Sequence, residues 1–378
     1  MELKELQAHI RTLVSLDETE APVLSCYLNL DTGNADFRQA LGERVSVLRR
    51  AFPPSERASF EDALARVDAF LGSGVLTTTR GLALFARGGS EPFFLALQFQ
   101  VPLPNRLSVD RTPHISHLVE LKDTYDRYIL MICTEDAERI LEVNLGAVTK
   151  ELWAARPELG KRVGSGWTRT HYQHHRRATD ARSIEQKVQI LERLVQERGH
   201  TYLILAGDPR ITTRVRTCLP DHLAAKLVDI VPASGQAETA DIVAATLSTF
   251  IEQEEQESTD AVALLLGELR RNGLGVVGTT PTLLALELGQ VDVLLMAAAY
   301  EPPPGWGCSS CGALVARSAR PSHCDRCDAD DLRATDLKEQ MVKLAEQHGS
   351  HVEFVPHNDV LMELGGVGCL LRYQLNAA

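Results

Sequence analysis

The chain has 378 residues, of which 44 % are hydrophobic and 24 % are charged. This length suggests two or three domains, and this composition is that of a globular protein with ample core. The formal net charge of −12 argues against a protein that coats nucleic acid through its bulk charge. Because no apolar run is long enough to cross a bilayer and the first residues lack a signal-peptide pattern, we expect a cytoplasmic protein without a membrane segment.

The first 115 residues are predicted to form an α/β domain, because short apolar runs alternate with helical patterns. Strands are predicted at Val23–Leu30, Arg80–Ala86 and Phe93–Val101, and helices at Arg38–Phe52 and Glu56–Leu71. The proline-rich segment Pro102–Pro113 is predicted to be a domain boundary.

A second domain is predicted over residues 118–257. Strands are expected at Tyr128–Cys133, Arg139–Val143 and Tyr202–Gly207, with a long helix that ends at Gly199 and an acidic helix end at Glu252–Glu257. This alternation favours an α/β layer.

A third α/β domain is predicted over residues 258–378. Helices are expected at Asp260–Arg271, from Thr280 to Gly289, and at Thr335–His348, and strands at Val291–Met296, His351–Val355 and Val367–Tyr373. Thr280 is a capping residue and Pro281 suits the first turn of a helix.

Four cysteines in residues 305–331 carry the most specific motif of the chain. They are spaced as two C-x2-C pairs: Cys308, Cys311, Cys324 and Cys327. Two residues between thiols allow one tight turn to direct both sulfurs at a single point, and two such turns complete the tetrahedral shell that Zn²⁺ prefers. Disulfides are disfavoured because nothing places the chain in an oxidising compartment. We therefore predict a structural Zn²⁺ in a zinc ribbon. Arg317, Arg320 and Arg326 either offset the charge of the thiolates or contact rRNA or a protein partner.

A basic segment interrupts the acidic chain between Lys161 and Arg182. It begins with a glycine-flanked tip and interleaves cations with histidines and aromatic rings. Such a segment suits phosphate contacts and stacking on unpaired bases, although a solvated helix face explains it about equally well. The candidate RNA-binding residues are Lys161, Arg162, Gly164, Ser165, Gly166, Trp167, Arg169, His171, Arg176 and Arg177.

Two other metal-binding hypotheses are weaker. His171, His174 and His175 lack a nearby carboxylate and lie among arginines that would repel a cation. The acidic residues Asp123, Asp126, Glu135 and Asp136 imitate the carboxylates of a metal-dependent nuclease, but their spacing does not force them together, and surface acids are the commoner explanation.

The chain resembles the bacterial relatives of the archaeo-eukaryotic class I release factor and of Pelota. The resemblance rests on the order of modest motifs: Tyr128–Met131, Ala137–Ile140 and Gly146, the glycine-tipped basic loop, Leu205–Pro209, Val291–Leu295, the cysteine ribbon, and Gly365–Tyr373. It implies a divergent N-terminal α/β domain, an RNase H-like middle domain, and a C-terminal α/β domain similar to kink-turn-binding ribosomal proteins. It also implies work in the ribosomal A site, with rRNA, ribosomal proteins and a translational GTPase as partners, and with neither membrane nor DNA.

The loop tip departs from the family pattern. Release factors carry Gly-Gly-Gln there, whereas this chain has Ser165-Gly166-Trp167. An indole offers one hydrogen-bond donor and no acceptor, so it is a poor substitute for the glutamine amide. The resemblance therefore favours a non-catalytic factor that occupies idle or stalled ribosomes, like the Balon-like factors associated with hibernation.

Two alternatives remain open. In the first, the protein is a peptidyl-tRNA or RNA hydrolase that uses a different residue set near the loop. In the second, it is an interaction scaffold with the ribbon as its partner-binding surface.

Overall fold

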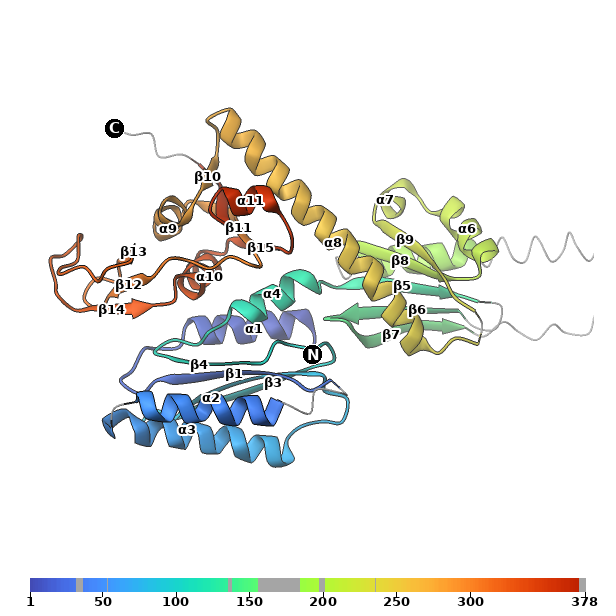
Figure 1. The fold of residues 1–378 in the computed structure, drawn as a ribbon. Coiled ribbons are helices and arrows are strands. Elements are labelled where there is room, and N and C mark those ends of the chain that lie inside the picture. The colour runs from blue at the N-terminus through green and yellow to red at the C-terminus, as the bar shows by residue number, and fades with distance from the viewer. Residues whose placement is uncertain are drawn as a thin grey trace, which may run out of the picture. The chain divides into compact units, whose positions relative to one another are not determined.

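The computed structural model describes residues 1–31, 37–52, 54–134, 138–155, 184–196, 201–234 and 236–373 (Figure 1). The helices are α1 Leu3–Val14, α2 Phe37–Ala51, α3 Pro54–Ser73, α4 Ser116–Thr124, α6 Pro209–Cys218, α7 Asp221–Ala224, α8 Thr239–Arg270, α9 Thr279–Glu287, α10 Leu337–His348 and α11 Asp359–Glu363, and residues 184–196 are also helical. The strands are β1 Val23–Asn29, β2 Gly81–Arg87, β3 Phe93–Phe99, β4 Arg106–Asp110, β5 Tyr128–Cys133, β6 Glu138–Asn144, β7 Ala147–Ala155, β8 Tyr202–Gly207, β9 Leu227–Pro232, β10 Gly275–Val277, β11 Val291–Ala297, β12 Gly305–Cys308, β13 Leu314–Ala316, β14 Leu332–Thr335, β15 His351–Val355 and β16 Val367–Leu371. The predicted α/β class is confirmed.

The N-terminal sheet is antiparallel, with the strand order β3-β2-β1-β4. Alternate residues of β1 and β2 pack against α2 and α3 on one face, and α1 lies on the opposite side of the sheet (Figure 1). The predicted strands and helices are confirmed. The sequence did not predict α1, nor β4, which lies inside the proline-rich segment and pairs with β1.

The middle sheet is mixed, with the order β7-β6-β5-β8-β9. Its central strand β5 pairs antiparallel with β6 and parallel with β8. The helix over residues 184–196 covers one face, and the first half of α8 covers the other through Ile242, Val243 and Phe250. Both faces of β5 are therefore buried, which explains its uninterrupted apolar run.

The C-terminal sheet has the order β10-β16-β11-β15, in which only β11 and β15 are parallel. The ribbon strands β13-β12-β14 form a separate sheet of three strands. Gly365 and Gly366 adopt positive φ angles of 101° and 74° immediately before β16, where the chain makes a tight turn that favours glycine.

Helix α8 is continuous across the predicted boundary between residues 257 and 258. Ser258 and Thr259 look like a helix start in sequence, but their hydroxyls bond the carbonyls of Glu254 and Glu255 within the helix. The two predicted helices on either side of this boundary are therefore one.

The chain forms two compact units. The middle unit is Tyr125–Gln253 with the first three residues, and the terminal unit is Lys4–Thr124 together with Glu254–Ala378. Three separate domains stay a prediction. Among the described residues, no helix is both long and apolar enough to cross a bilayer.

The two halves of the terminal unit are joined at α4. The carboxylate of Glu339 on α10 accepts hydrogen bonds from the backbone N–H groups of Ile115 and Ser116, at 2.8 and 3.0 Å, and from the Ser116 hydroxyl at 2.5 Å. This carboxylate satisfies donors at the start of α4 and complements its dipole. At the other end of α4, Lys122 binds Glu346.

Candidate functional site

The two C-x2-C motifs fold into matching turns. In the first turn the N–H of Cys308 donates to the carbonyl of Ala313 at 2.9 Å, and in the second the N–H of Cys324 donates to the carbonyl of Ala329 at 2.8 Å. The residue after each second cysteine is left-handed, with φ of 74° at Gly312 and 61° at Asp328. Asp tolerates this conformation better than most residues, which explains why the second motif manages without a glycine.

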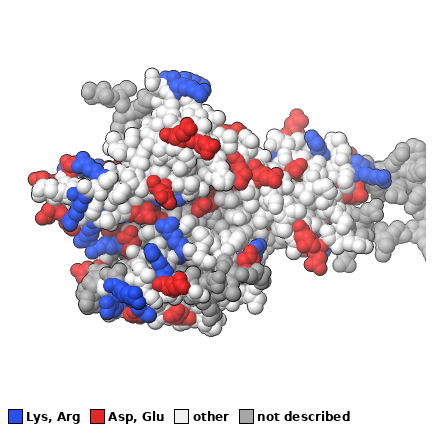
Figure 2. Space-filling view, in the orientation of Figure 1, with Lys and Arg blue, Asp and Glu red and all other residues white. Residues whose placement is uncertain are grey.

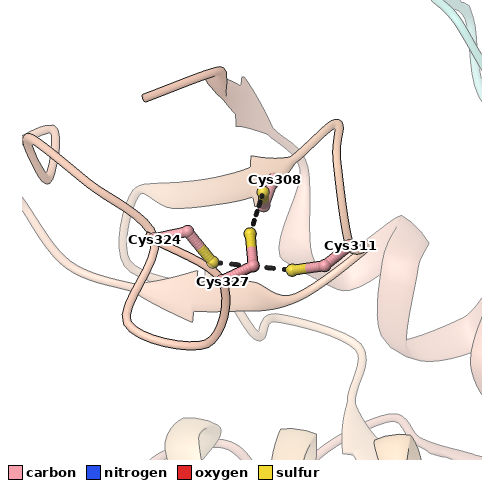
Figure 3. Close-up of side chains that lie close together, drawn as sticks. All are labelled: Cys308, Cys311, Cys324 and Cys327. Atoms are coloured by element: carbon pink, nitrogen blue, oxygen red, sulfur yellow. Dashed lines mark hydrogen bonds between the residues drawn. The ribbon is translucent and has the colours of Figure 1, made fainter. Parts of the chain in front are cut away.

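The four sulfurs converge between these turns (Figure 3). Cys308 Sγ lies 3.6 Å from Cys327 Sγ, and Cys311 Sγ lies 3.6 Å from Cys324 Sγ. All four sulfurs lie within 4.8 Å of one another. A disulfide requires about 2.05 Å between sulfurs, whereas a tetrahedron with metal–sulfur bonds of about 2.3 Å has edges of about 3.8 Å. The cluster can therefore hold a metal ion.

Backbone N–H groups point at the sulfurs. The N–H of Arg326 donates to Cys324 Sγ at 3.4 Å. The N–H of Cys311, helped by that of Ser310, lowers the pKa of the Cys308 thiol to about 7, whereas hydrogen bonds with the neighbouring thiols raise the pKa of Cys327 to about 12 in the absence of metal. Such backbone donors favour the thiolate, which is the form that binds metal.

The ribbon arginines bind carboxylates and a carbonyl. Arg317 pairs with Asp325 at 2.8 Å, and Arg320 donates to the Asp330 carbonyl at 3.4 Å. Arg326 reaches Glu287 of α9 at 3.1 Å, and the other oxygen of Glu287 accepts from the N–H of Leu314 at 3.0 Å. Glu287 thus fastens the ribbon to α9. The predicted electrostatic role of the arginines toward the thiolates stays a prediction.

The predicted RNA-binding residues lie outside the described part of the chain, as do His174 and His175. What the structure does describe is the frame on either side. Ala155, at the end of edge strand β7, pairs in register with Glu138 of β6. Lys187, in the first turn of the following helix, binds the carboxylate of the same Glu138, and both side chains are largely buried. The two described ends of the chain that flank residues 156–183 are therefore both held at Glu138.

The face in Figure 2 carries both signs of charge interspersed, with acidic side chains spread over much of it. This distribution agrees with the net charge of −12.

The nuclease hypothesis gains no support from the described residues. Glu135 and Asp136 lie outside them, and Asp123 faces a different group. Its ligand atoms lie within 4.8 Å of those of His351 and Glu353 on β15. Sequence reasoning missed this group because its members are distant along the chain and meet only through the packing of α4 on β15.

Comparisons with known proteins cover the whole chain. Residues 113–250 match the family described as bacterial archaeo-eukaryotic release factor family 10. The chain is 24 % identical to peptide chain release factor subunit 1 of Thermococcus onnurineus, over 99 % of this chain and 98 % of the relative. The same protein from Pyrococcus abyssi is also 24 % identical, over 99 % of each chain.

Among solved structures, Archaeoglobus fulgidus Pelota aligns with 99 % of this chain and 93 % of its own, at 12 % identity and a TM-score of 0.36. The family match and the end-to-end sequence alignments confirm the expected resemblance. Residues 113–250 thus match a release factor family, and the chain as a whole is similar to archaeal peptide chain release factors.

Proposed function

We propose that this protein is a non-catalytic translation factor that binds in the A site of idle or stalled ribosomes. The observation that carries the proposal is the end-to-end alignment with archaeal peptide chain release factors, which extends over 99 % of the chain. An alignment of that extent supports a shared overall task more strongly than a match to one domain.

The sequence of the tip supports a role without peptide release. The chain contains no Gly-Gly-Gln, since its two Gly-Gly pairs are followed by Ser90 and Val367. When the chain is aligned on the glycine of the tip and the basic segment after it, Trp167 stands at the position of the glutamine. An indole cannot accept a hydrogen bond from a water molecule, so it cannot position the water as an amide does.

The basic segment supplies the proposed contacts with rRNA. Lys161, Arg162, Arg169, Arg176 and Arg177 bind phosphates, and Trp167 stacks at the tip. His171 and the glycines of the tip complete the proposed interface. The C-terminal part of the terminal unit docks on ribosomal protein, rRNA or a translational GTPase, as the family resemblance implies.

The test is co-sedimentation of the purified protein with 70S ribosomes across a salt series. We expect salt-sensitive binding by the wild type and its loss in the double variant Arg176→Glu, Arg177→Glu. The matched control reverses another adjacent pair, Arg270 and Arg271, at the exposed end of α8. Equal binding by both variants would remove the basic segment from the interface.

A peptidyl-tRNA hydrolysis assay on the same samples separates the alternatives. Binding without hydrolysis supports the proposal. Hydrolysis that disappears on substitution of His171 or His175 identifies an enzyme instead. Absence of binding at every salt concentration, including the lowest, favours the interaction scaffold, because phosphate contacts are strongest there.

We also propose that the ribbon binds a structural Zn²⁺. Four thiolate ligands leave no position open for a substrate or water. The other thiols provide an internal reference: Cys26, Cys133 and Cys369 are buried, and burial raises the pKa of each to about 12, whereas Cys218 is exposed. A thiol reagent should therefore modify Cys218 alone in the native protein.

Zinc removal should change that thiol count. After treatment with a chelator, we expect the four ribbon cysteines to become reactive together with the release of Zn²⁺ and a lower melting temperature. The variant Cys218→Ser is the control, and it should show no reactive thiol until the chelator is added. Ribbon thiols that react without chelator would argue against a bound metal.

A further inference from the structure

Three side chains outside the ribbon converge on one point within the terminal unit. Asp123 is near the end of α4, and His351 and Glu353 are two residues apart on β15. Residues i and i+2 of a strand point to the same face. Because α4 packs on β15, Asp123 faces both of them.

The spacing of their ligand atoms suits one metal ion. His351 Nε2 lies 3.2 Å from Glu353 Oε2 and 3.7 Å from Asp123 Oδ1. The three ligand atoms lie within 4.8 Å of one another. A tetrahedral Zn²⁺ with bonds of about 2.0 to 2.2 Å separates its ligands by about 3.3 to 3.6 Å. Small side-chain adjustments therefore bring all three atoms into a coordination shell.

Hydrogen bonds from outside the group orient both carboxylates. The N–H of Phe354 donates to Asp123 Oδ2 at 2.7 Å. The hydroxyl of Ser258 on α8 donates to Glu353 Oε1 at 2.5 Å. Each carboxylate thus uses one oxygen for an outer partner and directs the other oxygen toward His351. Carboxylates that ligate metals are held by outer hydrogen bonds in the same manner.

The local charge is negative and shielded from water. The side chain of Asp123 is 8 % exposed and that of Glu353 is 13 % exposed. Glu254 places a further carboxylate near Asp123, and the nearby ammonium group of Lys122 binds Glu346. Two carboxylates removed from water require a counter-charge, and a divalent ion supplies one.

We propose that Asp123, His351 and Glu353 form a binding site for one divalent transition-metal ion, Zn²⁺ being the ion best suited to this donor set. Imidazole favours Zn²⁺ over the hard cations, and two carboxylates neutralise its charge. Three protein ligands leave a fourth position, on the side of the half-exposed His351, for water or a partner's side chain. This site depends neither on the ribbon nor on ribosome binding.

The test counts metal in the full-length protein after dialysis against buffered Zn²⁺. The wild type should retain two equivalents and His351→Ala one, with unchanged accessibility of the ribbon thiols. His357→Ala, a change at an exposed histidine just beyond β15, is the matched control and should retain two. One equivalent in the wild type and in His351→Ala alike would overturn the proposal, and would assign the carboxylates a shared proton or a protonated His351 instead.

Two further measurements separate metal loss from misfolding. Ser258→Ala keeps all three ligands, yet it should weaken Zn²⁺ binding at this site tenfold or more, because it frees the Glu353 carboxylate. Substitution with Co²⁺ should add an absorption without sulfur-to-metal charge transfer, and His351→Ala should abolish that absorption while the ribbon's thiolate band remains. If the Co²⁺ spectra of the wild type and His351→Ala coincide, the site does not exist.

Discussion

His114 is a titratable residue held between carboxylates inside the terminal unit. Its Nε2 lies 3.3 Å from Asp110 Oδ2, and its Nδ1 lies 3.6 Å from Glu339 Oε1. Burial lowers the pKa of His114, but the hydrogen bond to Asp110 and the charges of Glu339, Asp110 and Asp336 together raise it above its ordinary value. The folded state therefore holds this proton more tightly than the unfolded chain does.

Stability should consequently fall as the pH rises through the folded pKa of His114. The contribution of this proton is complete below the unfolded pKa of about 6.5 and is lost above the folded pKa. A folded pKa that lies one pH unit above the unfolded pKa corresponds to about 1.4 kcal/mol of stability. The free energy of unfolding, measured in urea from pH 6 to 8.5, should decline more steeply in the wild type than in His114→Asn.

The substitution preserves the neighbouring contacts, because Tyr27 and Ser25 bind only the backbone of residue 114. His9→Asn on α1 is the control and should keep the wild-type slope. Identical slopes for the wild type and His114→Asn would show that this proton is not linked to folding.

The residues that sequence predicted best are those whose geometry is local. The spacing Cys308, Cys311 and Cys324, Cys327 specifies two turns, and the sulfurs meet as expected. By contrast, Glu339 and Ser116 are separated by more than half of the chain and have no motif that links them. The group of Asp123, His351 and Glu353 was missed for the same reason.

At the scale of elements, apolar runs predicted the buried strands reliably. Residues that often mark the end of an element, such as proline and serine, led to wrong predictions of where elements begin and end. β1, β5, β8 and β11 are buried and continuous in sequence, and all four were predicted. β4 was missed because prolines flank it, although none lies within it and it pairs only along one side. The division of α8 at Ser258 failed because the serine hydroxyl bonds inside the helix and to Glu353, instead of capping a new one.

Gly207 lies where β8 approaches β5 so closely that there is no room for a side chain. Its φ is +139°, and a Cβ at this position would lie 1.9 Å from the carbonyl oxygen of Cys133. We expect Gly207→Ala to destabilise the middle unit by more than about 3 kcal/mol, because backbone must move to relieve the clash. Urea denaturation followed by circular dichroism measures the effect.

Gly42 in α2 provides the opposite case as a control. A Cβ there would meet no atom within 4 Å, and a glycine inside a helix costs about 0.5 to 1 kcal/mol relative to alanine. Gly42→Ala should therefore be neutral or stabilising. A comparable loss of stability in both variants would mean that the close contact between β5 and β8 is not the reason why position 207 requires glycine.

At the scale of the whole molecule, the chain passes from the terminal unit into the middle unit after Thr124 and returns at Glu254. The terminal unit is therefore discontinuous in sequence but held together by its own contacts, among them those of Glu339 with the start of α4. The sequence pattern could not reveal this, because periodicity reports elements and not which distant elements share a core.

A chain in which a short Gly-Ser linker replaces residues 125–253 should fold. We expect it to unfold cooperatively and to keep the pH dependence assigned to His114, since every group around that histidine remains. A chain with Glu339→Ala in the same background is the control and should be less stable by about 1 to 3 kcal/mol, because buried N–H groups lose their acceptor. An aggregated or non-cooperative product without the middle unit would contradict the division into two units.

Glu138 has a consequence for how this protein can change over evolutionary time. The strand before the basic segment and the helix after it are both fixed at this residue. Where the ends of a connection are already fixed, doubling its length costs only about 0.6 kcal/mol of closure entropy. A change in the length of the chain between residues 155 and 184 therefore adds little closure entropy to the cost of folding the middle unit. Selection can alter the length of this connection at that small entropic cost.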